Sequence, residues 1–458
     1  MSYRTSPAGT FELVEATLNS IDPGDPFETV DIKKLIHTFS ISESVTKGYL
    51  SGEAKLYDAA GIFYNLPLRG QELLHLKISD FKFEEWEGDF FIYAVDQVKP
   101  AKKSTDKMLE YIIKFVSLGK FIAERHTIRR CIATGGEGSR QYMPISEQVQ
   151  VIYDDYYKFE NGNGVKGISP EKEIEISDTT GDQKIIIPAL SPDDAMHLLS
   201  RRAHSQEYPS DMFRFFETRE KYHFSNLEEL ITFNSPEFVY FYNSGGQSSG
   251  PDSELIKMQQ VLDLDLGETV NTFRVMKEGG YNRAYTAVDT ASRFASTYTY
   301  EHYDEMINQK NFSYTDMHNT DGTKIRFNHT ESFIKTHLDS HKRLYGLKDY
   351  PDQDTSSAPG LRPNAWYAEI VNHKGAHLSQ FDEYYVKIRV YGTNELHPGK
   401  MIVLDIPEFR DDSASNARIK DKVRSGVYMI TEIQNDFYEN TFYQTLTLIT
   451  SGLSDNGR

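Results

Sequence analysis

Apolar and polar positions alternate most regularly near the C-terminus of the sequence. In residues 385–390 apolar side chains alternate with Lys387 and Arg389, which is the two-residue period of a strand with one buried face. A Pro-Gly pair at 398–399 predicts a tight turn, because proline fixes φ at a negative value and glycine tolerates a positive one. Further runs of strand character lie at 401–406, 426–433 and 442–450. We therefore expect residues 384–452 to form a small antiparallel β-barrel.

A second strand-rich stretch occupies the N-terminal part of the sequence. Prolines and a glycine at 22–26 interrupt it, since these residues do not continue strand pairing. Asp58 precedes a short apolar run and is a candidate helix N-cap. The predicted strands lie at 10–19, 32–41, 49–58, 70–78, 90–98 and 109–117. They predict an upstream barrel that closes with residues 111–117.

Between these two stretches the pattern becomes helical. Residues 144–159 place apolar side chains at helical spacing, which predicts an amphipathic helix. A Ser-Pro-Asp-Asp sequence at 191–194 predicts a helix start, because serine caps, proline fits the first turn and acids favour the positive end of the dipole. An aromatic run at 213–224 predicts a β-hairpin, with Ser225 capping a helix that begins at Asn226.

The residues before the C-terminal strands show two different patterns, first strand-like and then helical. Residues 262–275 and 284–300 are strand-rich and are expected to supply the first part of the second barrel. The following residues are polar and partly helical, with helices predicted at 330–345 and 366–378. We therefore expect an excursion to split the second barrel.

Four short motifs carry a resemblance to a known family. They are a Leu-x-Pro-Gly turn at 396–399, a Tyr-x-Ile-x-x-Ile block at 428–433, a Phe-Tyr-x-Thr-Leu-x-Leu strand at 442–448 and a Ser-x-Leu-Glu-x-Leu run at 225–230. Together they resemble baseplate hub proteins of contractile-tailed, T-even-type bacteriophages. They also resemble the related hub part of type VI secretion spike proteins.

The resemblance implies a particular architecture. The expected fold is α+β and mainly β, with two tail-tube-like antiparallel β-barrels plus a mixed α/β middle domain and a helical insertion. The implied division is a first tube-like barrel at 1–120, a middle α+β domain at 121–245, the first part of the second barrel at 246–303, a helical and loop excursion packing with the middle domain at 304–378, and the closing part of the second barrel at 379–458.

The resemblance also implies a structural and non-enzymatic function without a cofactor. Three copies of a two-barrel chain present six barrels in a ring, which adapts a six-fold tail tube to a three-fold spike. The implied partners are two further copies of the chain, the tail tube protein, the central spike protein, and the tape measure and baseplate wedge proteins. DNA only passes through the central channel, and no membrane insertion is expected. The implied location is the tail baseplate of the virion, after assembly in the host bacterial cytoplasm.

The strand predicted at 442–450 is the leading candidate for an interface. It is dense in β-branched and aromatic residues and carries no charge, which predicts that both of its faces are covered. Core packing explains this pattern better than an interface does, and the interface is the alternative. The candidate interface residues are Phe442, Tyr443, Thr445, Thr447, Ile449, Val386 and Ile388.

Composition limits the alternatives. A chain of 458 residues is long enough for two to four domains. With 50 Lys and Arg against 68 Asp and Glu, the net charge is −18, which argues against a nucleic-acid binder because phosphate affinity needs clustered cations. A channel past which DNA slides would also be acidic.

Cysteine usage and apolar runs bear on the compartment. Cys131 is the only cysteine, so no intrachain disulfide forms, and we expect it to be a small buried apolar side chain. Neither a secretory signal nor an apolar run long enough to span a bilayer is visible. These features predict a protein that folds in a cytoplasm.

Two pairs of histidines are the only weak indication of catalytic chemistry in the sequence. His337 and His341, like His373 and His377, are four residues apart, a spacing that places two imidazoles on one helix face. Leu338 stands where a zinc protease needs a glutamate beside the first histidine, so solvated helix faces explain the spacing better. The alternatives left open are a distal tail or tube adaptor of another tail type and, in a different class, a metal-dependent or cell-wall hydrolase.

Overall fold

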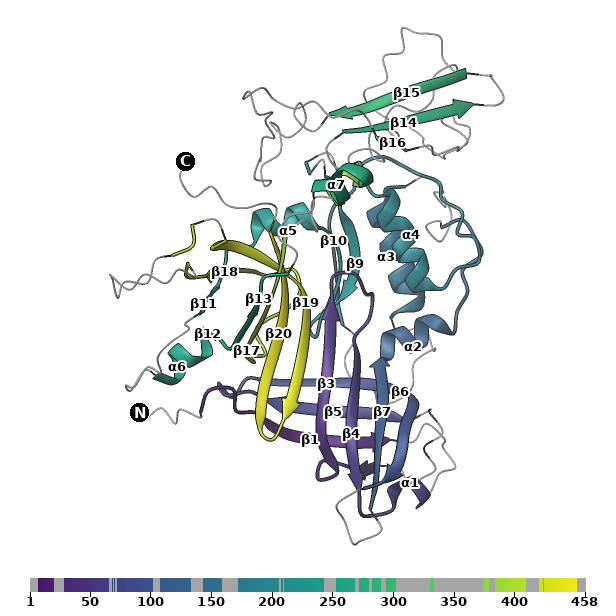
Figure 1. The fold of residues 1–458 in the computed structure, drawn as a ribbon. Helices are drawn as coiled ribbons and strands as arrows, with labels where there is room; N and C mark the ends of the chain where they lie inside the picture. The colour runs from purple at the N-terminus through teal and green to yellow at the C-terminus, as the bar shows by residue number, and fades with distance from the viewer. Residues whose placement is uncertain are drawn as a thin grey trace, which may run out of the picture.

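The described residues form a mainly β fold of the α+β class, as the sequence predicted (Figure 1). The computed structural model describes residues 7–19, 29–65, 68, 70, 72–101, 108–132, 143–158, 172–205, 207–208, 210–242, 253–267, 272–279, 282–289, 294–301, 330–332, 374–378, 384–408, 420–422 and 424–450.

Seven antiparallel strands form the N-terminal unit, in the order β2-β1-β5-β6-β7-β4-β3. They are β1 (Glu12–Asn19), β2 (Thr29–Asp31), β3 (Ile36–Ser44), β4 (Ser51–Asp58), β5 (Leu73–Ser79), β6 (Glu85–Pro100) and β7 (Leu109–Ser117). All six strands predicted for this stretch are confirmed. The short strand β2 had no clear pattern in the sequence.

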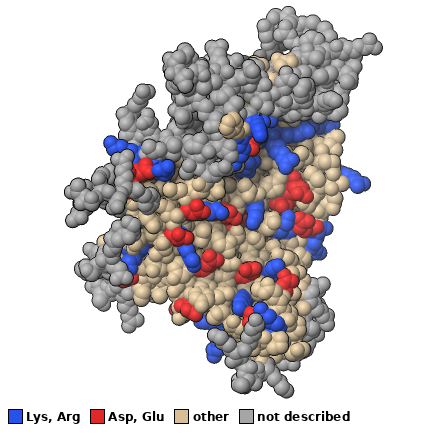
Figure 2. Space-filling view, in the orientation of Figure 1, with Lys and Arg blue, Asp and Glu red and all other residues tan. Residues whose placement is uncertain are grey.

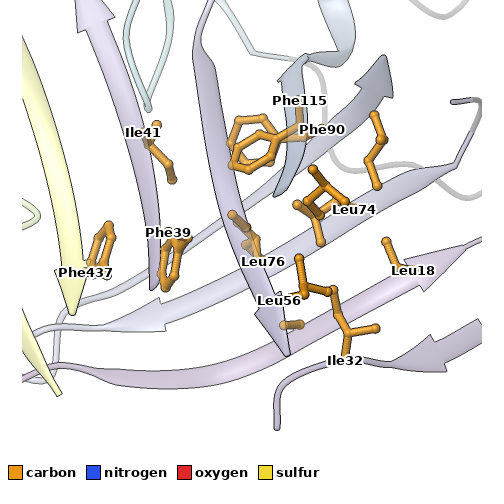
Figure 3. Packing of buried hydrophobic residues seen from close by; sticks show 14 of the residues in the cluster. Leu18, Ile32, Phe39, Ile41, Leu56, Leu74, Leu76, Phe90, Phe115 and Phe437 are labelled. Atoms are coloured by element: carbon orange, nitrogen blue, oxygen red, sulfur yellow. The ribbon is translucent and has the colours of Figure 1, made fainter. Parts of the chain in front are cut away.

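The long strand β6 lets the N-terminal unit fold over itself. Its residues 85–91 pair with β5 on one edge, and its residues 90–100 pair with β7 on the other, with two register shifts along the second stretch. Strands β1 and β5 therefore cross β3 and β4 in Figure 1. Alternate apolar side chains of both layers fill the space between them (Figure 3), and Leu56, Leu76 and Phe115 are completely buried there.

Seven further strands form the C-terminal unit, in the order β12-β11-β18-β19-β20-β17-β13. They are β11 (Phe238–Tyr242), β12 (Gln260–Val261), β13 (Asp263–Asp265), β17 (Tyr384–Tyr391), β18 (Met401–Asp405), β19 (Gly426–Tyr438) and β20 (Thr441–Thr450). The four strands predicted near the C-terminus are confirmed. Strand β11 pairs in parallel with β12 and β18, so this unit is not wholly antiparallel.

Strands β3 and β19 join the two units into one 14-stranded sheet. One edge of β19 pairs first with β18, through residues 426–429, and then with β3, through residues 432–438. The sequence predicted two antiparallel β-barrels, whereas the described strands of both units belong to one sheet and do not form closed barrels. The reason is that β19 is 13 residues long, longer than its sequence pattern at 426–433, and its second half takes its partner from the N-terminal unit.

The middle part of the chain packs helices on a small sheet. Strands β8 (Ile174–Ile176), β10 (Tyr222–Asn226) and β9 (Phe213–Glu217) pair in that order, and the helices are α2 (Leu118–Glu124), α3 (Ile145–Tyr156), α4 (Pro192–Arg202) and α5 (Leu227–Phe233). Apolar residues of α3, α4, β9 and β10 share one buried core. The helix predicted at 144–159 and the hairpin predicted at 213–224 are confirmed.

Helix caps test three sequence predictions. The Ser191 side chain accepts a hydrogen bond from the Asp194 amide at the start of α4 (3.2 Å), as predicted. Asp58 accepts from the Phe63 amide (2.8 Å), but the short helix α1 (Ile62–Asn65) begins four residues after it, so Asp58 binds the helix start without occupying the predicted N-cap position. For α5 the cap is Asn226, whose side chain accepts from the Glu228 amide (3.0 Å). The prediction of Ser225 was wrong by one residue because β10 continues through Asn226.

The region before the C-terminal strands departs most from expectation. Strands β14 (Asn282–Asp289), β15 (Phe294–Glu301) and β16 (Thr330–Ser332) form a separate three-stranded sheet and do not pair with the C-terminal unit. Within 262–275, a short strand is followed by helix α7 (Thr272–Glu278), and α6 (Ser253–Met258) lies just upstream.

Two predicted helices fall largely outside the described residues. Of 330–345, only 330–332 are described, and they form a strand, so the prediction is wrong there. Of 366–378, residues 374–378 are described and helical.

Candidate assembly surface and the junction that positions it

The pairing of β3 with β19 brings three rings together at one end. The rings of Phe39 and Phe437 stack with centroids 4.3 Å apart and planes 9° apart. Phe437 in turn stacks on Phe442, also at 4.3 Å. Both strands therefore contribute to one aromatic stack, and this apolar contact fixes how the two units meet.

A buried ion pair occupies the other end of the same pairing. Arg219 lies in the turn between β9 and β10 and reaches Glu43 of β3, with Nε 2.7 Å from Oε1 and side chains 1% and 0% exposed. The Arg219 backbone amide donates to the second Glu43 oxygen (3.1 Å). The remaining guanidinium nitrogens donate to Asn394 Oδ1 (2.8 Å) and to the Leu396 carbonyl (3.0 Å). The hairpin tip is thereby held by both units.

Amide side chains extend this junction into β19 and β20. Asn435 Nδ2 donates to Glu43 Oε1 and to the Ile41 carbonyl, both at 3.1 Å. Gln444 Nε2 donates to Asn435 Oδ1 (2.8 Å) and to the Thr393 carbonyl (3.0 Å), while the Thr393 amide donates back to Gln444 Oε1 (3.0 Å). We call Glu43, Arg219, Asn394, Asn435 and Gln444 the junction network. Buried polar groups that are all paired in this way specify one arrangement of the elements that carry them.

His397 sits between two carboxylates at the edge of the junction network. Its Nε2 is 3.1 Å from Glu220 Oε1 and its Nδ1 is 3.6 Å from Glu43 Oε2. Burial acts to raise the pKa of Glu43, but the Arg219 guanidinium and His397 outweigh it and lower the pKa to about 2. The close contact with His397 likewise lowers the pKa of Glu220 to about 2. Both carboxylates are therefore held in the charged form.

A second polar contact locks the middle part onto the N-terminal unit. Glu217, at the end of β9, is 1% exposed and accepts from Lys172 Nζ (2.5 Å), the Ser117 hydroxyl (2.5 Å) and the Leu50 amide (3.2 Å). A Cβ at Gly48 would lie 2.1 Å from Asp193 Oδ1, so only glycine fits this close approach. The middle part therefore meets β3, β4 and β7 at fixed points.

One side of the 14-stranded sheet continues from the C-terminal unit to the N-terminal unit. In register, the outward side chains of six successive strands are Arg389, Thr445, Gln434, Ser42, Ser51 and Val116. We call the outward side of β17, β20, β19, β3, β4 and β7 the polar face. The serine and threonine side chains of this row are half-buried, whereas Arg389 is exposed.

Charges on the polar face are matched by neighbours. Lys55 Nζ is 2.9 Å from Glu110, and Lys114 Nζ is 2.6 Å from Asp96. The Arg389 guanidinium lies over the Tyr443 ring at 4.5 Å. Figure 2 shows acidic and basic side chains interspersed across the middle of the molecule. Lys55, Lys114 and Arg389 therefore have partners, whereas Lys387 and Glu53 are exposed on the same face.

The predicted interface residues differ in burial. Val386, Ile388, Phe442 and Ile449 are at most 5% exposed within this single chain and contribute to its core clusters. Ile449 lies on the same side of β20 as Thr445 and Thr447, but Met212, Phe216 and Leu227 of the middle part cover it. Tyr443, Thr445 and Thr447 point to the polar face and are half-buried. Strand β20 pairs with β17 and β19, so it has no free edge, and its outer side is only partly covered. The interface assignment stays a prediction for these three residues.

The histidine pairs offer no metal site in the part of the chain that the structure describes. His337, His341 and His373 lie outside it, and His377 is buried on the helical segment 374–378. Among the described residues, no group of three His, Cys, Asp or Glu side chains could hold a metal ion. Cys131 is half-buried with a free thiol. No helix among the described residues is long and apolar enough to cross a membrane.

The junction network was missed by sequence reasoning, although a signal for it exists. Glu43 continues the inward period of Phe39 and Ile41, and Asn435 stands between the inward Ile433 and Phe437. A carboxylate and an amide at core positions of predicted strands indicate a buried polar network. Nothing in the local pattern points to Arg219 as their partner, because it lies 176 residues away from Glu43.

Comparison with solved structures gives the class of fold. The chain is similar to a tail protein of Neisseria meningitidis MC58, with a TM-score of 0.50 and 8% identity over 97% of this chain and 98% of that one. It is also similar to the 43 kDa tail protein of prophage MuSo2 from Shewanella oneidensis (TM-score 0.48, 9% identity, 95% and 98% covered). An Escherichia coli type VI secretion component described as structurally similar to phage tail proteins matches at a TM-score of 0.37, with 10% identity over 97% of this chain and 77% of that one.

The similarity to the Neisseria meningitidis tail protein identifies the fold. Across nearly all of both chains, this protein shares the fold of a tail protein. The resemblance to tail proteins expected from the sequence motifs is therefore confirmed at the level of fold. No protein-family model and no curated protein matches the sequence.

Proposed function

We propose that this protein is the structural hub of a phage tail baseplate. In this proposal three copies form a ring that adapts a six-fold tail tube above to a three-fold central spike below, and the ring leaves a central passage. The protein acts by assembly rather than by catalysis. The tube protein and the spike protein are its direct partners, and the virion tail is its location.

The observation that carries the proposal is the single sheet made from two units. Each unit corresponds, in this proposal, to one tube-like repeat, with β1 to β7 in the first and with β11 to β13 and β17 to β20 in the second. Pairing of β3 with β19 sets the two repeats side by side, so three chains would place six repeats in a closed ring. The shared fold with a tail protein over 97% of this chain supports the same reading.

The junction network supports a hub more than it supports an enzyme. Its charged and amide groups are buried and satisfied by one another, whereas a catalytic group must reach a substrate. Such a network holds two repeats and the middle part, at 121–245, in one orientation. A rigid subunit is what a symmetry adaptor needs, because each repeat must meet a tube subunit in the same way.

The test is the solution mass by light scattering on a sizing column, with electron-microscope class averages of the same peak. A trimer of the 52.6 kDa chain gives 3 × 52.6, or roughly 158 kDa. We expect this mass and an annular end view with a pseudo-six-fold outline. A monomer without a central opening, persisting when a candidate spike chain is added, would overturn the proposal.

A further inference from the structure

The helical segment 374–378 places a buried cation against the end of α4. Lys374 is 7% exposed, and its Nζ donates to the Ser200 carbonyl in the last turn of that helix (2.5 Å). The negative end of the helix dipole favours a cation at this place. Ser200 is the hydrogen-bond partner of Lys374 among the described residues, so two of the three ammonium protons are left to be satisfied.

Arg283 brings a second cation to the same segment. This residue lies on β14, and a Cβ at Gly375 would lie 1.6 Å from its Nη1. The guanidinium therefore packs directly against the Gly375 backbone, in the space that a Cβ would need. The Arg283 Nε is buried and has no hydrogen-bond partner in the described part of the chain. Burial lowers the pKa of Arg283.

Two more arginines lie close to Lys374. Arg201 follows Ser200 at the end of α4, and Arg214 belongs to β9. Burial lowers the pKa of Lys374 to about 7, and these two guanidinium groups act in the same direction. In Figure 2 Lys and Arg side chains gather over this end of α4 and over α7. Positive charge is therefore concentrated here in a chain that is acidic overall.

Asp211 is the described carboxylate that opposes this positive charge. It is 1% exposed and acts to raise the pKa of Lys374. Its two oxygens already accept from the Ser205 amide (2.9 Å) and lie beside His204 Nδ1 (2.9 Å). A buried cation without a paired anion has a large desolvation cost, so the surroundings of Lys374 call for a further anion.

We propose that Lys374 and Arg283 bind a small tetrahedral oxyanion of the phosphate type, with Arg201 and Arg214 at the edge of the site. The ammonium has protons left to donate and the guanidinium has its Nε–H, and an ion with several acceptor oxygens satisfies both. The burial of Lys374 restricts the ligand to a small free ion. A bound ion would join the β14 sheet to the middle part through segment 374–378. This inference does not depend on the proposed hub function.

The test uses sulfate as the probe, because sulfate is a dianion at neutral pH and has no proton of its own to lose. Sulfate is titrated into the purified full chain in a calorimeter, with chloride holding the ionic strength constant. We expect saturable binding. Lys374→Met and Arg283→Met should each weaken it by about tenfold or more, because each removes a charge-assisted hydrogen bond.

The matched control removes a cation elsewhere on the surface. Lys221→Met deletes an exposed ammonium that pairs with Glu175, and it should change the sulfate affinity by less than about twofold. Arg283→Lys keeps the charge but loses the Nε–H, so it should weaken binding less than Arg283→Met does. Circular dichroism checks that every variant is folded.

Proton uptake gives a second measurement that needs only the unmutated chain. Because the pKa of Lys374 is about 7, its amine is about half protonated at neutral pH, and a bound anion should raise that pKa. Sulfate binding should then take up about half a proton. This uptake appears as a dependence of the binding heat on the ionisation enthalpy of the buffer, and Lys374→Met should abolish it.

The outcomes separate this site from general charge effects. Absence of sulfate binding above the chloride background would overturn the inference, and so would equal weakening by Lys221→Met or an affinity that Lys374→Met leaves unchanged. Inorganic phosphate should displace sulfate, whereas displacement by acetate alone would identify a carboxylate site and overturn the assignment. The chain is measured in whatever oligomeric state it adopts, so failure to form a ring would refute the proposed function without touching this result.

Discussion

The two ends of the β3–β19 pairing are built in opposite ways. At one end Phe39, Phe437 and Phe442 form an aromatic stack. At the other end Glu43 and Asn435 are buried and hydrogen-bonded to each other, and the Glu43 charge is compensated only when Arg219 arrives from the hairpin. The aromatic end gains free energy from burial in many side-chain arrangements, whereas the polar end gains it in one arrangement only. The comparison suggests that the aromatic end supplies adhesion and the polar end supplies orientation.

Removing the cation should have the largest effect. Arg219→Met leaves the Glu43 carboxylate buried without its partner, and we expect the free energy of unfolding to fall by about 3–5 kcal/mol. Urea denaturation followed by circular dichroism measures this. The control is Lys221→Met two residues along, whose exposed ammonium pairs with Glu175 at the surface, where a loss under about 1 kcal/mol is expected. Equal losses of stability in the two variants would show that the buried pair contributes no more than the surface pair.

Lowering the pH should have the next largest effect on stability, through the polar end. The pKa of Glu43 is about 2 in the fold against an ordinary 4.5, so the unfolded chain takes up the proton first as pH falls. The stabilisation is therefore complete above pH 4.5 and is lost as pH falls towards 2, by about 3 kcal/mol in total. Glu43→Gln should remove this part of the pH dependence of the urea midpoint. An unchanged acid slope in that variant would contradict the assignment.

Shortening a ring at the aromatic end should cost less. Phe437→Leu keeps an apolar side chain but loses both stacks, and we expect a loss of about 1–2 kcal/mol in the free energy of unfolding. Tyr438→Leu is the matched control, since this neighbouring ring is 45% exposed and should change stability by less than about 0.5 kcal/mol. If Phe437→Leu proved as damaging as Arg219→Met, the aromatic end would be setting orientation too.

The outward side of the same strands should matter least. Ser42→Ala alters the polar face beside the junction without touching a buried group, and we expect a change of less than about 0.5 kcal/mol, measured by thermal unfolding. A much larger loss would mean that the polar face contributes to folding.

Sequence patterns predicted the strands well because most have one buried side. Strands β3, β7 and β20 show the two-residue period clearly, and local alternation was enough to find them. The prediction of a strand-rich segment at 262–275 failed in part because short apolar runs fit strand and helix alike. The separate β14–β15 hairpin has an ordinary strand pattern, and its sequence carries no signal about which sheet it joins.

The candidate site was less predictable than the fold. The four buried members of the predicted interface set look the same in sequence whether they face a core or another copy. The junction network depends on partners far apart in sequence, and alternation specifies which face a residue occupies but not what it meets there.

The distance along the chain between β3 and β19 also governs how the protein is made. Asn435 binds Glu43 across 392 residues, so at about 5–20 residues per second β3 would wait roughly 20–80 s for its partner during synthesis. Until then the N-terminal unit presents an unpaired strand edge, which invites association between nascent chains. Productive assembly thus depends on the timing of translation, and fragments ending before β19 should aggregate.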